Sequence, residues 1–212
     1  MTPALTSDRA SAAPSENVLP MLAHEIRQPL GAIEALAYYM ALLHGKDAKQ
    51  REQLTRIQRL VEYSNWILSS SLALADPRPV APIAADLEEL ILHVMSVRSV
   101  PTDPPLNLVL APDLPLVRLD PAFGRVLIET LLGLFRQLAT PAHPATLRAA
   151  ATAGGVELEL STAAPGYRST GALPPGSGLS LDCAGRIAAM HGGSVDYSVD
   201  PLSGIRVRVM LP

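Results

Sequence analysis

Two stretches near the start of the chain repeat apolar residues at helical spacing, and this pattern constrains the fold more than any other feature. In the first stretch the apolar residues stand three or four positions apart: Val18, Leu22, Ile26, Leu30, Ile33, Ala37, Met40 and Leu43. Such steps draw one apolar stripe along an amphipathic helix. The pattern therefore predicts a helix over residues 18–44, with Gly45 as its C-terminal stop.

A second helix is predicted over residues 47–75, where apolar residues recur every seven positions at Leu54, Val61, Leu68 and Ala75. Two long helices with a short connection form an antiparallel hairpin. A single hairpin cannot hide both stripes, whereas two hairpins associating into a four-helix bundle would bury them. The pattern thus predicts a homodimer, and it places Val61 in the seam between the two hairpins.

The chain divides by composition into four segments. Residues 1–17 are rich in Ala, Ser, Pro and Thr and are predicted to be a disordered tail. Residues 18–76 form the hairpin, 77–83 a proline-rich linker, and 84–212 a second domain. In that domain we predict helices over 84–100, 120–139 and 179–190, and strands over 106–110, 156–160, 194–199 and 205–211. This mixture indicates an α+β sandwich, with one helical layer on one largely antiparallel sheet.

Composition excludes several functional classes. The net charge is −3, the pI is near 5.9, and basic residues form no cluster, which argues against nucleic acid as a partner. One cysteine, Cys183, cannot make an internal disulfide and suits a reducing cytoplasm. We find no signal peptide and no apolar run near the ~20 residues that span a bilayer. We therefore expect a cytoplasmic protein that carries no membrane sensor of its own.

His24 is the candidate reactive residue. At about 100° per residue it lies some 200° from Leu22, on the face opposite the apolar stripe. Glu25 stands beside it, and Gln28 lies one turn further along the same face. A neutral imidazole nitrogen is a nucleophile, and a carboxylate that holds the other ring N–H favours the reactive tautomer. We therefore take His24, Glu25 and Gln28 as the candidate catalytic residues.

The segment from Met21 to Leu30 resembles the H-box of bacterial two-component histidine kinases, in which the histidine accepts a phosphoryl group. At the position of Gln28 that family often has Thr or Asn, which orients a hydrolytic water. The second domain resembles the family's ATP-binding domain. Its glycine box matches Gly176 to Leu181, followed by His191-Gly192-Gly193 and a terminal strand ending at Pro212. The resemblance covers nearly everything from residue 18 onward.

The phosphate-handling residues depart from that resemblance. Glu129 and Gly133 stand where the family has asparagines that hold Mg²⁺ and the nucleotide. Thr162 or Ala163 replaces the adenine-binding aspartate, and only Gly166 remains of the two glycines that follow it. The segment between Gly166 and Gly176 is also short for a lid. We therefore expect no ATP-dependent transfer and no cofactor bound by this chain.

Together these features favour a dimeric histidine phosphotransferase of a phosphorelay. It would move a phosphoryl group between His24 and an aspartate on a response-regulator receiver domain, and that receiver would bring its own Mg²⁺. Two alternatives remain open: an active histidine kinase with divergent nucleotide boxes, and a non-enzymatic scaffold that binds receivers. The remaining histidines are interpreted as structural or surface residues, with no metal site: His44, His93, His143 and His191.

Overall fold

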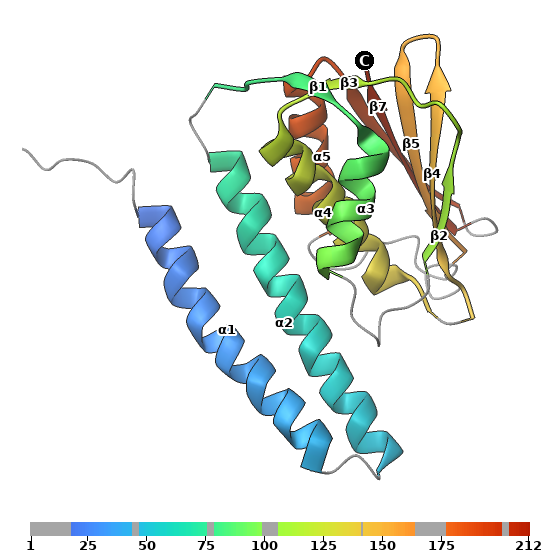
Figure 1. Ribbon diagram of the computed structural model, residues 1–212. Helices are drawn as coiled ribbons and strands as arrows, with labels where there is room; N and C mark the ends of the chain where they lie inside the picture. Colours follow the sequence, from blue (N-terminus) through green and yellow to red (C-terminus); the bar gives the residue numbers. More distant parts are fainter. Residues whose placement is uncertain are drawn as a thin grey trace, which may run out of the picture.

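A computed structural model describes residues 18–43, 47–75, 79–98, 106–140, 142–163, 177–200 and 204–212. The elements run in the order α1, α2, β1, α3, β2, β3, α4, β4, β5, α5, β6, β7 (Figure 1). The predicted disordered tail, the predicted helix stop Gly45 and the residual box glycine Gly166 lie outside the described residues.

The predicted hairpin is confirmed: α1 (Val18–Leu43) and α2 (Ala48–Ala75) pack side by side (Figure 1). Asp47 begins α2, because its Oδ1 accepts the backbone N–H groups of Lys49 at 2.9 Å and Gln50 at 3.4 Å. These are donors that a helix start otherwise leaves unpaired. Ala23 and Ala37 of α1 are buried, and such small side chains let the two helices approach closely.

The burial of Val61 on α2 corrects its predicted place in the seam between two hairpins. Val61 is only 3% exposed in a single chain, so it cannot mark a seam that forms when two hairpins meet. The seven-residue repeat predicted the helix correctly, but a repeat does not tell whether the stripe faces its own chain or a partner.

The second domain is built on a five-stranded sheet with strand order β2-β4-β5-β7-β6. Only β2 and β4 pair in parallel; the other neighbours are antiparallel. The strands are β2 (Leu106–Leu110), β4 (Ala145–Thr152), β5 (Gly155–Thr162), β6 (Ser194–Asp200) and β7 (Gly204–Leu211). A separate antiparallel pair joins β1 (Ile83–Ala85) to β3 (Val117–Leu119).

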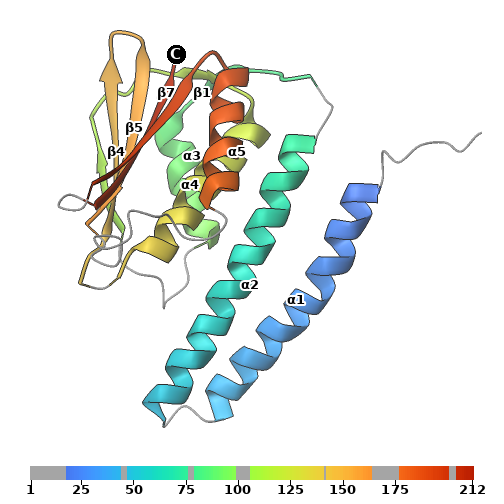
Figure 2. The ribbon, with the colours of Figure 1, turned by 180° about the vertical axis from the view of Figure 1, so that it is seen from behind.

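Helices α3 (Leu87–Arg98), α4 (Pro121–Leu138) and α5 (Ser177–Met190) cover one face of this sheet (Figures 1 and 2). The core between them is apolar, with Phe123 and Leu127 of α4 buried in the same cluster as Leu158 and Val207 of the strands. The other face carries polar side chains, such as Glu159, which pairs with Arg206 and Arg208. The predicted α+β sandwich is therefore confirmed.

One buried histidine ties the helices together. The Asp120 carboxylate caps α4 by accepting the N–H groups of Ala122 and Phe123. The His191 Nε2 accepts the Asp120 N–H at 3.0 Å, and Nδ1 lies 2.7 Å from the Ile187 carbonyl oxygen. A carbonyl only accepts, so the ring carries its proton on Nδ1. His191 is thus a structural link and not only a turn residue.

The sequence prediction placed one helix start too early and missed three strands, β1, β3 and β4. The helix predicted over 84–100 begins only at Leu87, because Ile83–Ala85 pair with β3 and Asp86 then accepts the Glu89 N–H at 3.1 Å. Strands β3 and β4 were not predicted at all. A three-residue strand is too short to show a period, and the alanines of β4 carry little strand signal, although Ala145, Leu147 and Ala149 alternate inward.

Candidate functional site

The His24 ring is exposed on α1 and bonded to one neighbour. The Gln28 side-chain amide nitrogen lies 3.0 Å from the His24 Nε2. An amide nitrogen only donates, so Nε2 is the acceptor and the ring proton is on Nδ1. The sequence predicted that these two residues share a face, and the structure brings them into contact. Their arrangement presents the lone pair of Nε2 toward the amide.

Glu25 is exposed beside His24. In the described part of the chain, the hydrogen bond that reaches the ring comes from Gln28 and not from Glu25. The predicted role of Glu25 in holding the second ring N–H therefore stays a prediction.

An open strip of small and apolar side chains continues from His24 along α1. Gly31, Ala35 and Leu42 follow at 7, 11 and 18 residues, which at about 100° per residue returns each to within roughly 20° of His24. A side chain built on Gly31 would meet nothing within 4 Å, and Leu42 is 66% exposed. The helix can therefore be approached closely below the ring.

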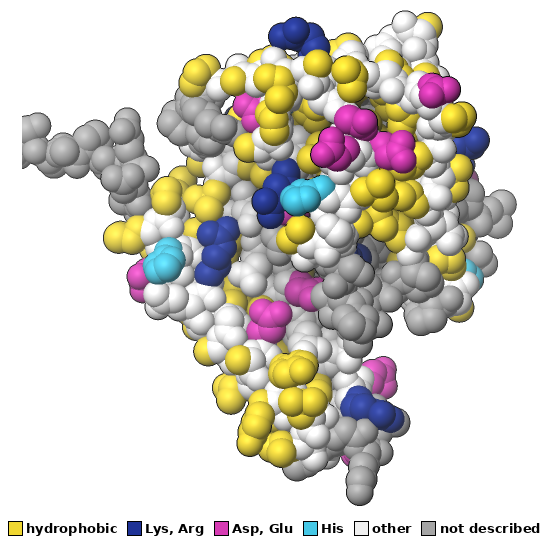
Figure 3. Space-filling model, viewed as in Figure 1, with side chains coloured by type: hydrophobic (Ala, Val, Ile, Leu, Met, Phe, Trp, Pro, Cys, Tyr) yellow, Lys and Arg dark blue, Asp and Glu magenta, His cyan; other side chains and the backbone are white. Residues whose placement is uncertain are grey.

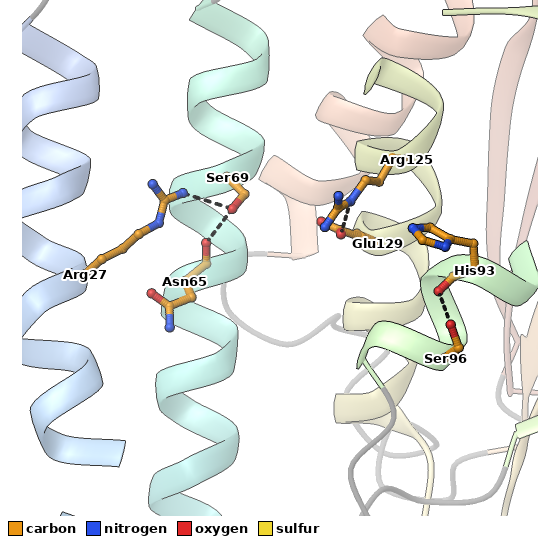
Figure 4. Close-up of polar contacts among 7 residues, drawn as sticks. All are labelled: Arg27, Asn65, Ser69, His93, Ser96, Arg125 and Glu129. Carbon is orange, nitrogen blue, oxygen red and sulfur yellow. Dashed lines mark hydrogen bonds and ion pairs between the residues drawn. The ribbon is translucent and has the colours of Figure 1, made fainter. Parts of the chain in front are cut away.

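Arg27 fixes this part of α1 to α2 (Figure 4). Its guanidinium donates to the Ser69 hydroxyl at 3.1 Å, and that hydroxyl donates to the Asn65 carbonyl oxygen at 3.0 Å. The contact joins the turn of α1 that carries His24 to the C-terminal half of α2. Sequence reasoning did not single out Arg27, since the contact depends on the hairpin register.

On α4, the two positions that the resemblance assigns to metal and nucleotide do not fit that task. The Glu129 carboxylate is held by Arg125 on the same helix at 2.8 Å (Figure 4). Gly133 offers no ligand, and a Cβ built on it would lie 3.3 Å from the Trp66 ring. Mg²⁺ needs several hard oxygen ligands in octahedral geometry. Gly133 supplies no oxygen and the Glu129 carboxylate is paired with Arg125, so these two positions cannot complete such a shell.

The adenine-binding position fits no better. Thr162 is buried at the end of β5, and its hydroxyl donates to the His143 carbonyl oxygen at 3.5 Å. A hydroxyl occupied in this way is no substitute for a carboxylate that accepts an amino group.

The hairpin and the second domain share a buried contact that sequence reasoning missed. The Ser70 hydroxyl of α2 lies 3.2 Å from the Thr130 hydroxyl of α4, and the Cys183 thiol of α5 donates to the Ser70 carbonyl oxygen at 3.7 Å. Burial raises the pKa of the Cys183 thiol. Two sequence features could have pointed to this interface. They are the single tryptophan of the chain, Trp66, and a glycine, Gly133, in the middle of a predicted helix.

The other features of the described residues are plain. No group of three or more His, Cys, Asp or Glu side chains comes together there. None of the described helices combines the length and the apolar character needed to cross a membrane. His93 is an exposed residue of α3 (Figure 4).

Among curated proteins, the chain is similar to sensor histidine kinase ZraS. It is 27% identical over 210 residues to ZraS of Escherichia coli O157:H7 and 26% identical over 209 residues to ZraS of Klebsiella oxytoca. Each match covers 90% of this chain but only 44% of the relative, so the chain spans less than half the length of these relatives. No family model matches the sequence.

Solved structures share the fold. Full-length ShkA in complex with AMPPNP matches 90% of this chain and 44% of its own, with a TM-score of 0.55 and 23% identity. The Acinetobacter baumannii histidine kinase AdeS matches 89% of this chain and 96% of its own, with a TM-score of 0.53 and 15% identity.

A helical hairpin followed by an ATPase-like sandwich defines a histidine kinase-like protein of two-component signalling. The chain is thus distantly similar to sensor histidine kinases along 90% of its length.

Proposed function

We propose that this chain is a histidine phosphotransferase, which moves a phosphoryl group between His24 and the aspartate of a response-regulator receiver domain. The observation that carries the proposal is the exposed His24 ring, whose Nε2 accepts a hydrogen bond from Gln28 at 3.0 Å. A ring in this tautomer presents an unprotonated nitrogen on an accessible helix face, as a nucleophile requires.

In the proposed step, the lone pair of the His24 Nε2 attacks the phosphorus of the receiver's aspartyl phosphate. The bond between phosphorus and the aspartate oxygen breaks, the aspartate leaves as a carboxylate, and a P–N bond forms. The proton on Nδ1 stays in place, so the ring gains positive charge, which Glu25 is positioned in sequence to neutralise. The reverse step returns the phosphoryl group to a carboxylate, so one site serves both directions.

Gln28 has two roles in this proposal. Before transfer, its amide selects the reactive tautomer by donating to Nε2. As the phosphorus arrives the amide turns aside, and once the receiver has left it orients a water for hydrolysis of phosphohistidine. Gln28 is therefore a residue that positions the ring first and the water later.

The strip from Gly31 to Leu42 is the proposed docking surface for the receiver. It begins directly below His24, has open space at Gly31 and ends on an exposed leucine. A helix of the receiver can pack against such small residues while the receiver's aspartate reaches the ring. In this proposal Mg²⁺ is bound by the receiver, whose acidic pocket supplies the oxygen ligands.

We also propose that the protein acts as a homodimer through the hairpin. Leu22, Ile26, Ile33 and Met40 follow one another along α1 and are each 44% to 48% exposed in a single chain. Figure 3 shows further apolar side chains gathered toward the lower end of the hairpin. Such a stripe on a helix is covered when two hairpins form a four-helix bundle, and it faces away from His24.

The test is incubation of the full chain with receivers phosphorylated by a small-molecule donor, without ATP. Wild type should acquire acid-labile, base-stable label, and His24→Ala should acquire none. His93→Ala is the matched control, since His93 is also an exposed helical histidine, and it should be labelled like wild type. Equal labelling of His24→Ala, or no label from any receiver, would refute the proposal and favour a scaffold. Label from ATP alone would favour a kinase.

A further inference from the structure

One contact between the hairpin and the second domain is an aromatic ring that lies against the helix backbone at a glycine. Trp66 of α2 is 9% exposed. A Cβ built on Gly133 of α4 would lie 3.3 Å from the Trp66 Cγ and Cδ2 and 3.4 Å from Cδ1. Such distances are tighter than ordinary carbon contacts, so any side chain at position 133 displaces the indole.

The indole also packs against a second aromatic ring. Tyr63, three residues earlier on α2, stacks on it with ring centroids 5.3 Å apart and planes inclined by 25°. The Trp66 Nε1 is buried without a hydrogen-bond partner, so packing and not a directional bond sets the ring position. A ring confined in this way responds strongly to a change in the surface beneath it.

The same turns carry polar contacts that exclude water. Ser70 lies one turn after Trp66, and Thr130 lies one turn before Gly133; their buried hydroxyls are 3.2 Å apart. The fully buried Cys183 of α5 adds a contact to the Ser70 carbonyl oxygen. Two turns of α2 are thus fitted to α4 and α5 at several points, and Figure 2 shows α2 running alongside these helices.

We propose that Trp66 and Gly133 form a joint that locks the hairpin and the second domain in one orientation. The indole occupies the space of the side chain that Gly133 lacks, the position at which the nucleotide resemblance fails. The second domain is then a fixed support for the hairpin that bears His24. Its consequence for phosphoryl transfer rests on the proposed function, whereas the joint itself does not.

The test measures the distance between two spin labels in the full chain by pulsed electron paramagnetic resonance. Gln53→Cys on α2 and Thr152→Cys on β4 supply exposed attachment sites, and the native Cys183 is too buried to react. Labelled protein is diluted with unlabelled protein so that only distances within one chain are read. We expect one narrow distance distribution for wild type.

Trp66→Ala and Gly133→Leu should each widen that distribution at least twofold. The combination of the two should narrow it again, because the leucine fills the space left by the indole. Gly178→Leu is the control: Gly178 is an exposed glycine of α5 whose built Cβ meets nothing within 4 Å, and its distribution should match wild type. Circular dichroism checks that each variant is folded. If Gly133→Leu does not fold, Gly133→Ala provides a milder change at the same position.

A broad distribution in wild type would overturn the joint, and so would an unchanged distribution in folded Trp66→Ala. The measurement needs no phosphoryl donor, so it separates the two proposals. A narrow distribution in a protein that never accepts phosphate at His24 would keep the joint and refute the phosphotransferase. Normal labelling of His24 with a broad distribution would do the reverse.

Discussion

Substitution of Ile33 by aspartate tests whether the exposed stripe of α1 is a dimer interface. Ile33 follows His24 by nine residues. Nine residues are two and a half turns of an α-helix, so the two side chains lie on opposite sides. Ile33 is 45% exposed in a single chain. The substitution therefore removes apolar surface that only a partner can cover, and it leaves the buried side of the hairpin intact.

The expected size of the effect follows from this exposure. Complete burial of an isoleucine side chain is worth roughly 1.5–3 kcal/mol, so the exposed part of Ile33 has about 1 kcal/mol left to gain from a partner. A two-fold dimer contains the residue twice. Ile33→Ala should therefore weaken the dimer by about 2 kcal/mol, or roughly 30-fold in Kd. Ile33→Asp adds the cost of desolvating a charge, several kcal/mol per copy, and should give a monomer.

Sedimentation velocity at micromolar concentration measures the outcome, and circular dichroism checks the helix content. Leu42→Asp is the matched control, because Leu42 is 66% exposed on the His24 side of the same helix. It should leave the dimer intact but reduce phosphoryl transfer from the receiver. A monomeric wild type would remove the bundle argument, and equal dissociation by both variants would show that the chosen stripe is wrong.

Four other predictions concern the site and the second domain. Gly133→Asn should not create measurable ATP binding in calorimetry, and thermal or denaturant unfolding should show a loss of about 1–3 kcal/mol as the side chain meets Trp66. Cys183 should react slowly with alkylating reagents until the chain unfolds, since burial raises the pKa of its thiol. The unfolded chain then loses that proton first, so stability should fall above about pH 8.5, and Cys183→Ala should remove this dependence. His191→Ala should lower the free energy of unfolding by about 1–3 kcal/mol, because the Asp120 N–H loses its acceptor. Gln28→Ala should slow the loss of phosphate to water by about 10-fold to 100-fold, measured as the decay of labelled protein, and should affect transfer to His24 much less, because the ring can still adopt the reactive tautomer without the amide.

The sequence predicted best those elements in which buried residues recur at a regular spacing over many turns. The hairpin helices and α4 show their stripes over many turns, and Asp120 has the residue type and position of a helix cap. Strand β4 failed this criterion, because Ala145 and Ala149 are buried by the surrounding sheet and not by their own hydrophobicity. Its alternation becomes visible only once β2 and β5 flank it.

The candidate site divides in a similar way. His24 and Gln28 are four residues apart on one helix, so local geometry brings them together, and the sequence was sufficient to predict it. Arg27 and Ser69 meet across the hairpin, and Trp66 and Gly133 meet across two domains. Such pairs depend on register and packing between elements, which no local pattern encodes.

The glycine at position 133 connects the loss of a nucleotide-binding side chain with the packing of α2 against α4. A domain that carries ATP to a histidine must keep the nucleotide-facing turns of α4 free, whereas a protein phosphorylated by its partner has no such requirement. With glycine at position 133, the same turns accept the flat ring of Trp66 and the hydroxyl of Ser70. In the proposed function, α4 thus provides the surface on which α2 packs. The hairpin held in this way presents His24 to the receiver.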